Sequence, residues 1–369
     1  MGRLTELDNS GAGMLRSLTG VGLDSMMLVG DKPWHFAANE DMIKLLAEGT
    51  KVTSADINKV AGLDWNVYQT PVYFRPEVAA PAIGLTEGGF KEAKLGSDPM
   101  YFLNIRDDLH TPVGVVKKRY RVFQNSAAPT FLDNLVDSGD AVYETAGSLH
   151  AGSQTFWLMK LPATVTVAGD PREGLETYIL LTNSHDGSTA IITSVVTVRV
   201  VCQNTLAYAL STALRTQKIK HTESAKEKFA LARKTLEIGY TYQDELAVIG
   251  EKMINTSFSD AEFEAFLNDL VPTPEKVTIK GKVKNQRGIT MAENTKESIV
   301  AINKNHPTQV HIKGTLWGAV QAVSYYSDHE QTARETEGSS AAENRFKRVM
   351  GYSGTTLSQK SFQKALALV

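Results

Sequence analysis

Cysteine is almost absent from this sequence: its 369 residues include one, Cys202. A single thiol excludes an internal disulfide framework and a structural zinc site built on paired cysteines. We therefore expect a protein of a reducing compartment, the cytoplasm of the cell that carries it.

Long apolar runs are lacking as well. No uninterrupted apolar stretch approaches the roughly 20 residues that cross a bilayer, and the first residues lack the apolar centre of a secretory signal. Charge of one sign is not in excess either, because 39 Lys and Arg face 41 Asp and Glu, for a net charge of -2 at pH 7. We expect no membrane partner, and any nucleic-acid binding has to come from local basic patches.

Recognisable catalytic motifs are also absent. The sequence contains no P-loop, no HExxH and no GxGxxG after a strand. The run TEGGFKE at 86–92 has adjacent glycines but lacks the lysine and the following apolar helix of a phosphate loop. We therefore name no catalytic residue, no metal ligand and no cofactor.

The patterns that are present predict an α+β fold: an antiparallel β-sheet built from hairpins, backed by helices, with a helical C-terminal half. Alternating segments predict strands over 65–74, 101–105, 113–122, 141–146, 154–161, 164–167, 177–181 and 190–201. Helical spacing predicts a helix capped by Ser54, one ending at Gly139, one capped by Asn204, a long one over 223–253 and one opening at Ser259. We divide the chain into a flexible arm (1–33), an α+β core domain (34–255) and a mainly helical C-terminal region (256–369).

The stretch over 181–211, which includes the turn and return strand of a predicted hairpin, holds the polar groups that an active site would use. Its return strand would place Val196, Val198, Val200 and Cys202 on one face, which we expect to be the core. His185 is more than ten residues from Cys202 along that strand, so it cannot serve as the base for this thiol, and we interpret Cys202 as a packed core residue. The run NSHDG suits a tight turn. His185, Asp186 and Arg199 nevertheless stay open as an unrecognised enzyme site.

Basic clusters are the positive signal. Four cations surround Tyr120, and strand alternation would place Lys117, Arg119 and Arg121 on one face. Further clusters precede the long helix and occupy 276–287, and Arg199 lies within a strand. The candidate nucleic-acid-binding residues are Lys117, Lys118, Arg119, Arg121, Arg199, Arg215, Lys218, Lys220, Lys282 and Lys284. The neighbouring aromatics Tyr120, Phe123 and Trp157 would stack on bases if they were exposed.

Four segments carry a resemblance to a known family: KPWH (32–35), YRVFQN with FLDNLV after it, YETAGSLHAGSQTFWLMKLP and YILLTNSHDGSTAIITSVVTVRVVCQNTL. Between about 30 and 253 the chain resembles the uncharacterised phage and plasmid-like protein family, a domain of unknown function found on mobile elements. This resemblance implies an origin in a bacteriophage, plasmid or integrated element and a role in the host cytoplasm. It implies no reaction.

Three functions follow as hypotheses. The first is a mobile-element protein of DNA metabolism that binds single-stranded DNA on a basic sheet, as an annealing or recombination protein and as a homo-oligomer. The curved sheet backed by helices in single-strand annealing proteins is a coarse architectural analogy for it. The second is an enzyme on DNA or nucleotides near His185, Asp186 and Arg199. The third is a structural or host-interaction protein without ligand chemistry.

Overall fold

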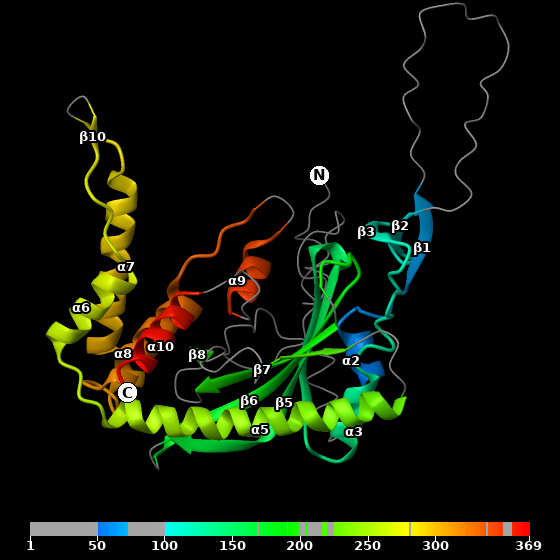
Figure 1. Cartoon of the computed structure of the whole chain (residues 1–369), viewed down its shortest axis with the longest axis horizontal. Helices are drawn as coiled ribbons and strands as arrows, with labels where there is room; N and C mark the ends of the chain where they lie inside the picture. Colours follow the sequence, from blue (N-terminus) through cyan, green and yellow to red (C-terminus); the bar gives the residue numbers. More distant parts are fainter. Residues whose placement is uncertain are drawn as a thin grey trace, which may run out of the picture.

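A six-stranded antiparallel sheet forms the centre of the computed structural model (Figure 1). Five strands lie in the order β4-β5-β6-β7-β8, and β9 pairs with the same edge of β7 as β8 does. Their bounds are β4 (Val142–Leu149), β5 (Gln154–Val167), β6 (Asp170–Ser184), β7 (Ile191–Arg199), β8 (Asn204–Thr205) and β9 (Thr216–Ile219). From β4 to β8, strands adjacent in the sequence are neighbours in the sheet, so the predicted α+β fold built from hairpins is confirmed.

The structure describes residues 51–72, 100–167, 170–189, 191–199, 204–205, 216–219, 225–279, 282–336, 339–349 and 356–369. The predicted arm over 1–33 lies outside these residues, as do the motif KPWH and Cys202.

A second, three-stranded antiparallel sheet lies at one end of the molecule, in the order β1-β2-β3 (Figure 1). Its strands are β1 (Val67–Val72), β2 (Tyr101–Arg106) and β3 (Pro112–Lys117). Side chains alternate between the two faces of each strand. One face, which includes Val67, Asn104 and Val116, is buried against the body, so the small sheet has an inner and an outer face.

The helices cover the main sheet and build the C-terminal half. They are α2 (Ser54–Val60), α3 (Thr130–Asp137), α5 (Ala225–Asn255), α6 (Asp260–Leu270), α7 (Gln286–Asn305), α8 (Leu316–Tyr325), α9 (Ala341–Val349) and α10 (Leu357–Leu366). Short helical turns are η2 (His150–Gly152), η3 (Pro307–Gln309) and the π-helical η4 (Tyr326–Glu330). None of the helices in the described ranges combines the length and apolarity that a membrane span needs.

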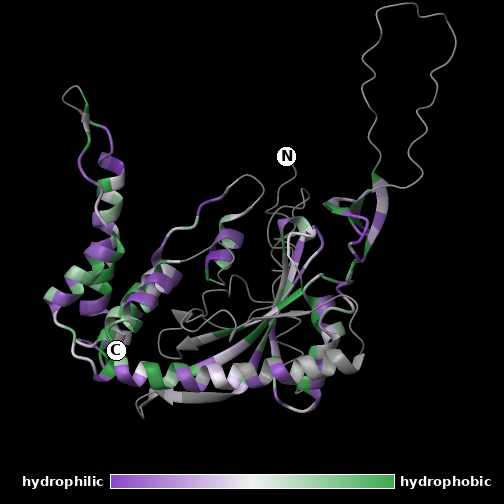
Figure 2. Ribbon diagram, in the orientation of Figure 1, coloured by the Kyte–Doolittle hydropathy of each residue, from purple (hydrophilic) through white to green (hydrophobic). Residues whose placement is uncertain are grey.

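Helix α5 runs along the main sheet, and hydrophilic and hydrophobic residues alternate along it (Figures 1 and 2). Helices α6 and α7 form an arm that projects from the body and carries a hairpin of β10 (Thr278–Ile279) and β11 (Lys282–Val283) at its free end (Figure 1). Ser259 caps α6, as predicted, because its hydroxyl accepts a hydrogen bond from Glu262 N at 3.3 Å while the Glu262 carboxylate accepts from Ser259 N at 2.7 Å. The Ser259 hydroxyl also donates to the Glu262 carboxylate, at 2.6 Å, and this bond together with the one from Ser259 N holds the pKa of Glu262 below its ordinary value.

Both faces of the main sheet are buried, so the prediction of a single core face in β7 is wrong. Val195 packs in a cluster with Leu246 of α5, whereas Val196, its neighbour on the opposite face, packs in a cluster with Phe346 of α9. The continuous valine run in this strand follows from cover on both sides. The side chain of Arg199, at the end of β7, lies outside the described residues.

Three other boundaries differ from the prediction. Thr53, not Ser54, caps α2, because the Thr53 side chain accepts from Asp56 N. Asn204, predicted as an N-cap, lies in β8, where it pairs with Arg199 of β7, and the helix predicted after it lies outside the described residues. Strand β5 continues through Pro162, and its register with β6 shifts between 160 and 164, because proline cannot donate a ladder hydrogen bond.

Candidate nucleic-acid interface

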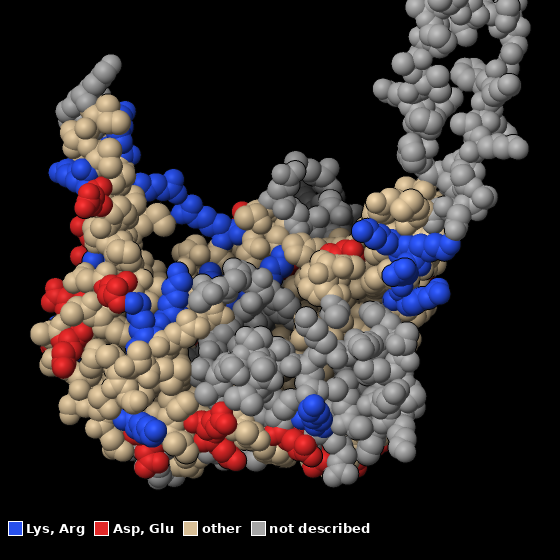
Figure 3. Space-filling model, viewed as in Figure 1, with Lys and Arg blue, Asp and Glu red and all other residues tan. Residues whose placement is uncertain are grey.

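The basic cluster around Tyr120 lies in an exposed turn at the end of β3. The strand ends at Lys117, and Tyr120 N donates to Lys117 O at 2.9 Å, which closes the turn. The predicted alternation over 113–122 is therefore wrong beyond Lys117, because the chain leaves the strand there. The four cations of this basic turn are all exposed: Lys117, Lys118, Arg119 and Arg121. Figure 3 shows blue side chains gathered beside the small sheet at this end of the molecule.

Tyr120 anchors the basic turn to the main sheet. Its hydroxyl donates to the backbone oxygen of Ser184 at the end of β6, at 2.6 Å. Burial raises the pKa of Tyr120, and the negative charge of Asp186 adds to this effect. Stacking by the neighbouring aromatics depended on their exposure, and this condition is not met: Tyr120 is half-buried and hydrogen-bonded, while Phe123 and Trp157 are buried in the core.

The outer face of the small sheet is aromatic and apolar. Val72 is opposite Tyr101 on β2, and Tyr101 is opposite Lys117 on β3, so these residues share the face that carries Tyr68. The exposed fractions are 45% for Tyr68, 46% for Tyr101 and 57% for Val115. Sequence reasoning missed both tyrosines because the runs WNVYQTPVYF and PMYFLNIR do not show which face meets the body.

A buried arginine fixes the inner face of this sheet. Arg106, the last residue of β2, is fully buried, and its Nε and Nη2 atoms donate to the two carboxylate oxygens of Asp108 at 3.0 and 2.8 Å. Its guanidinium lies 4.2 Å from the ring centroid of Trp65. Burial alone would raise the pKa of Asp108, but the hydrogen bonds and charge of Arg106 outweigh it and hold this pKa below its ordinary value.

His185 belongs to the seam between the two sheets and is fully buried. Its Nε2 atom is 3.0 Å from Asn125 Oδ1, and its backbone oxygen accepts from Asn104 Nδ2 at 2.5 Å. Asn183, two residues earlier, donates from Nδ2 to Phe123 O at 2.9 Å. These contacts hold β2 and the segment after β3 against β6, so His185 supports the interface from beneath.

The Asp186 carboxylate stabilises the turn in which it lies. Its carboxylate accepts from Ser188 N at 2.8 Å and from the Ser184 hydroxyl, and Gly187 adopts the left-handed conformation with φ 74°. This is the tight turn predicted for NSHDG. Within the described part of the chain, no three His, Cys, Asp or Glu side chains gather as metal ligands. His185 is fully buried, and the Asp186 carboxylate binds groups of its own turn.

The other predicted basic residues do not join the basic turn. Arg199 and Lys218 lie in β7 and β9 of the main sheet, and their side chains fall outside the described residues, as Arg215 and Lys220 do entirely. Lys282 lies in β11, and the exposed Lys284 is the first residue after this strand. Both lie at the free end of the α6–α7 arm. The predicted binding residues whose side chains are described therefore lie on two separate surfaces, the basic turn and the end of the α6–α7 arm.

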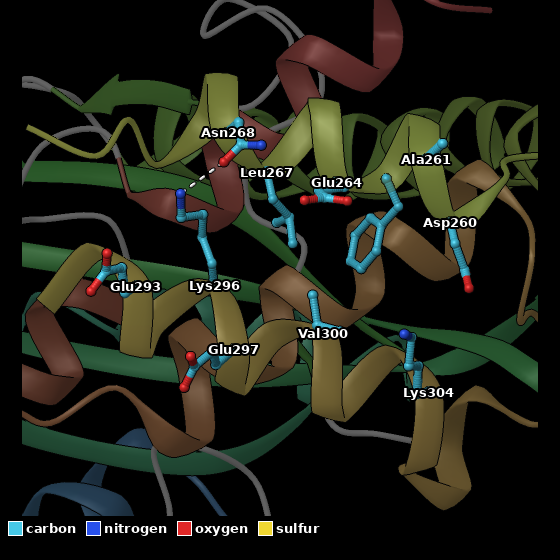
Figure 4. Close-up of a pocket in the computed structure, with 11 residues that line it drawn as sticks. Asp260, Ala261, Glu264, Leu267, Asn268, Glu293, Lys296, Glu297, Val300 and Lys304 are labelled. Atoms are coloured by element: carbon cyan, nitrogen blue, oxygen red, sulfur yellow. Dashed lines mark hydrogen bonds between the residues drawn. The ribbon is translucent and has the colours of Figure 1, made fainter. Parts of the chain in front are cut away.

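A cleft between α6 and α7 has a volume of about 520 Å³ and mixes both charges. Lys296 on its wall donates to Asn268 Oδ1 at 2.7 Å and to Thr273 Oγ1 at 2.7 Å, which ties the two helices together (Figure 4). The acidic residues at its rim are Asp260, Glu264, Glu293 and Glu297. This rim repels phosphates, so the cleft is not part of the candidate interface.

Fold and site together define an antiparallel α+β protein whose small outer sheet presents tyrosines beside an exposed basic turn. The chain belongs to the family described as Domain of unknown function (DUF932), whose model matches residues 112–350. That match begins at the first residue of β3, so it includes the basic turn, and it extends through α9. The comparison with curated proteins gave no match, and neither did the comparison with solved structures.

Proposed function

We propose that this chain binds single-stranded DNA on the outer face of the small sheet, with the basic turn holding the phosphates. The observation that carries this proposal is the exposure of Tyr68 and Tyr101 on the face that ends in Lys117. Aromatic rings stack on unpaired bases of any sequence, and a row of cations beside them tracks the backbone. Together they make a site for a flexible polyanion with free bases.

The biological setting belongs to the same proposal. The resemblance to phage and plasmid-like proteins points to DNA metabolism of a mobile element in the host cytoplasm, as an annealing or recombination protein. Such a protein works as a homo-oligomer, because one small sheet contacts few nucleotides and a strand has to be covered by several copies.

The test is a titration of the protein with a single-stranded oligonucleotide over a range of salt concentrations. Changing Lys117, Arg119 and Arg121 to Ala should weaken binding and flatten the plot of log K against log salt by about 2, since each lost phosphate contact removes roughly 0.7. Folding should survive, because all three side chains are exposed. The matched control changes three exposed lysines elsewhere, Lys59, Lys252 and Lys360, to Ala. Equal losses in both triple variants would contradict a local site.

The tyrosines give a second, independent test of the same site. Changing Tyr68 and Tyr101 to Ala should weaken single-strand binding by roughly 1–3 kcal/mol per stacked base, with an unchanged salt slope. The variant with Phe at both positions keeps the rings and should bind as the wild type does. If the Phe variant lost as much affinity as the Ala variant, the hydroxyl groups rather than the rings would make the contact, and stacking would be wrong.

A further inference from the structure

The β10–β11 hairpin exposes aliphatic side chains at the free end of the α6–α7 arm. Val277 and Ile279, on one face of this segment, are 48% and 51% exposed, and Figure 2 shows hydrophobic residues at this end of the arm. Asn285 closes the base of the hairpin, since its Oδ1 accepts from Val277 N at 2.9 Å and its Nδ2 donates to Glu275 O at 2.6 Å. A two-stranded hairpin that exposes apolar side chains to solvent is typical of a contact site.

The charge around these aliphatic residues selects the partner. Between 275 and 287 the sequence has five cations and one acid, Glu275. Lys276, Lys284 and Arg287 are exposed, and Lys284 N donates to Val277 O at 2.9 Å, so this lysine lies opposite the valine. Exposed aliphatic side chains surrounded by cations complement a polyanion whose apolar interior is accessible at one end. An open end of a nucleic-acid duplex has this chemistry.

The small sheet and the hairpin expose different kinds of apolar side chain, and each kind suits a different form of nucleic acid. Tyr68 and Tyr101 offer flat rings, which suit bases that are already unpaired. Val277 and Ile279 offer no ring to stack on, but aliphatic side chains of this kind fill the gap when a base step is opened. Resting on the proposed function, we infer that the hairpin is a wedge that inserts at the end of a duplex. The substrate class is then a partly double-stranded nucleic acid with a single-stranded tail.

The experiment uses the full chain and three probes: a tailed duplex with a fluorescent adenine analogue at the junction, the blunt duplex and the single strand alone. Insertion of the wedge unstacks the analogue, so its fluorescence should rise on binding of the tailed duplex. Changing Val277 and Ile279 to Ser should abolish this rise and weaken binding of the tailed duplex about tenfold, with single-strand affinity unchanged. The control changes Val310, an aliphatic residue that is 68% exposed elsewhere, to Ser and should leave all three signals intact.

The outcomes separate this inference from the proposed function. If the wild type binds the single strand but gives no fluorescence rise at the junction, the wedge is wrong and the single-strand site stands. If the Ser variant loses affinity equally for the tailed duplex and the single strand, the hairpin is a general contact and the wedge is wrong as well. If the variant that lacks Lys117, Arg119 and Arg121 still binds the single strand fully, the proposed function fails whatever the hairpin does.

Discussion

The side chain of Arg106 lies on the inner face of the small sheet. Its guanidinium contacts the Trp65 ring and pairs with the Asp108 carboxylate. Changing Asp108 to Asn should lower the free energy of unfolding by about 2 kcal/mol, because a fully buried arginine then loses the negative charge of Asp108. This is less than the roughly 3–5 kcal/mol of a fully buried pair, since Asp108 is one-third exposed. Urea unfolding at neutral pH measures the difference.

The same pair predicts a pH dependence. The folded-state pKa of Asp108 lies below its unfolded value, so its contribution is complete above the unfolded pKa and is lost as pH falls through the folded pKa. The Asn variant lacks this carboxylate, so its stability gap to the wild type should shrink in acid. A gap that stays constant down to strongly acidic pH would show that the Asn variant fails for a steric reason.

Individual residues show where sequence reasoning stops. The exposure of Lys117, Lys118, Arg119 and Arg121 could be predicted, because cations this close together in the sequence cannot be buried without partners. The exposure of Tyr68 and Tyr101 and the burial of Trp157 could not. Aromatic residues in strands look alike in sequence, and the face that is buried depends on where the small sheet meets the body, which distant residues such as His185, bonded to Asn104 of β2, decide.

Two glycines test the contacts between elements. Gly114 lies in β3 where the strand passes the turn at Asp186, and a Cβ there would overlap the Asp186 backbone. Gly114→Ala should therefore destabilise the fold by about 1–3 kcal/mol, since backbone has to shift to relieve the overlap. Gly288 in α7 is the matched control, because its added Cβ would find only ordinary contact with Pro274. Gly288→Ala should stabilise by about 0.5–1 kcal/mol. Thermal melts of both variants give the two signs, and destabilisation by both would contradict the assigned packing.

Among the elements, hydrophobic periodicity and capping residues predicted many of the helices and strands. The burial of each face of the main sheet was the hardest property to predict. The hairpins of the main sheet, the long helix α5 and the cap at Ser259 were predictable because each is encoded by nearby residues. The burial of both faces of β7 was not, since Phe346 and Leu246 approach it from elements that follow much later in the chain. The strand at Asn204 was mistaken for a helix start because the same residue type suits an N-cap.

At the scale of the whole molecule, the basic turn and the basic hairpin lie on separate projections of the body (Figures 1 and 3). A tailed duplex whose single-stranded tail is long enough to reach the basic turn should bind more tightly than one with a short tail, because the second contact is intramolecular once the first is made. Changing Lys276, Lys284 and Arg287 to Ala should remove this gain and leave the affinity for the single strand alone unchanged. Binding titrations with tailed duplexes of increasing tail length test it, and an equal loss at every tail length would contradict two separate contacts.

The contact of α9 with the main sheet has a consequence for biosynthesis. Glu343 Oε1 accepts from His150 N at 2.9 Å across 193 residues of sequence, and the Phe346 ring stacks on Phe156 with 4.2 Å between centroids. At about 5–20 residues per second, a ribosome needs about 10–40 s to make the intervening chain. During that interval the α9-facing side of the nascent sheet, with Phe156 and its aliphatic neighbours, is still uncovered. The growing chain therefore exposes an apolar surface to chaperones and to other nascent chains until α9 has emerged and covered it.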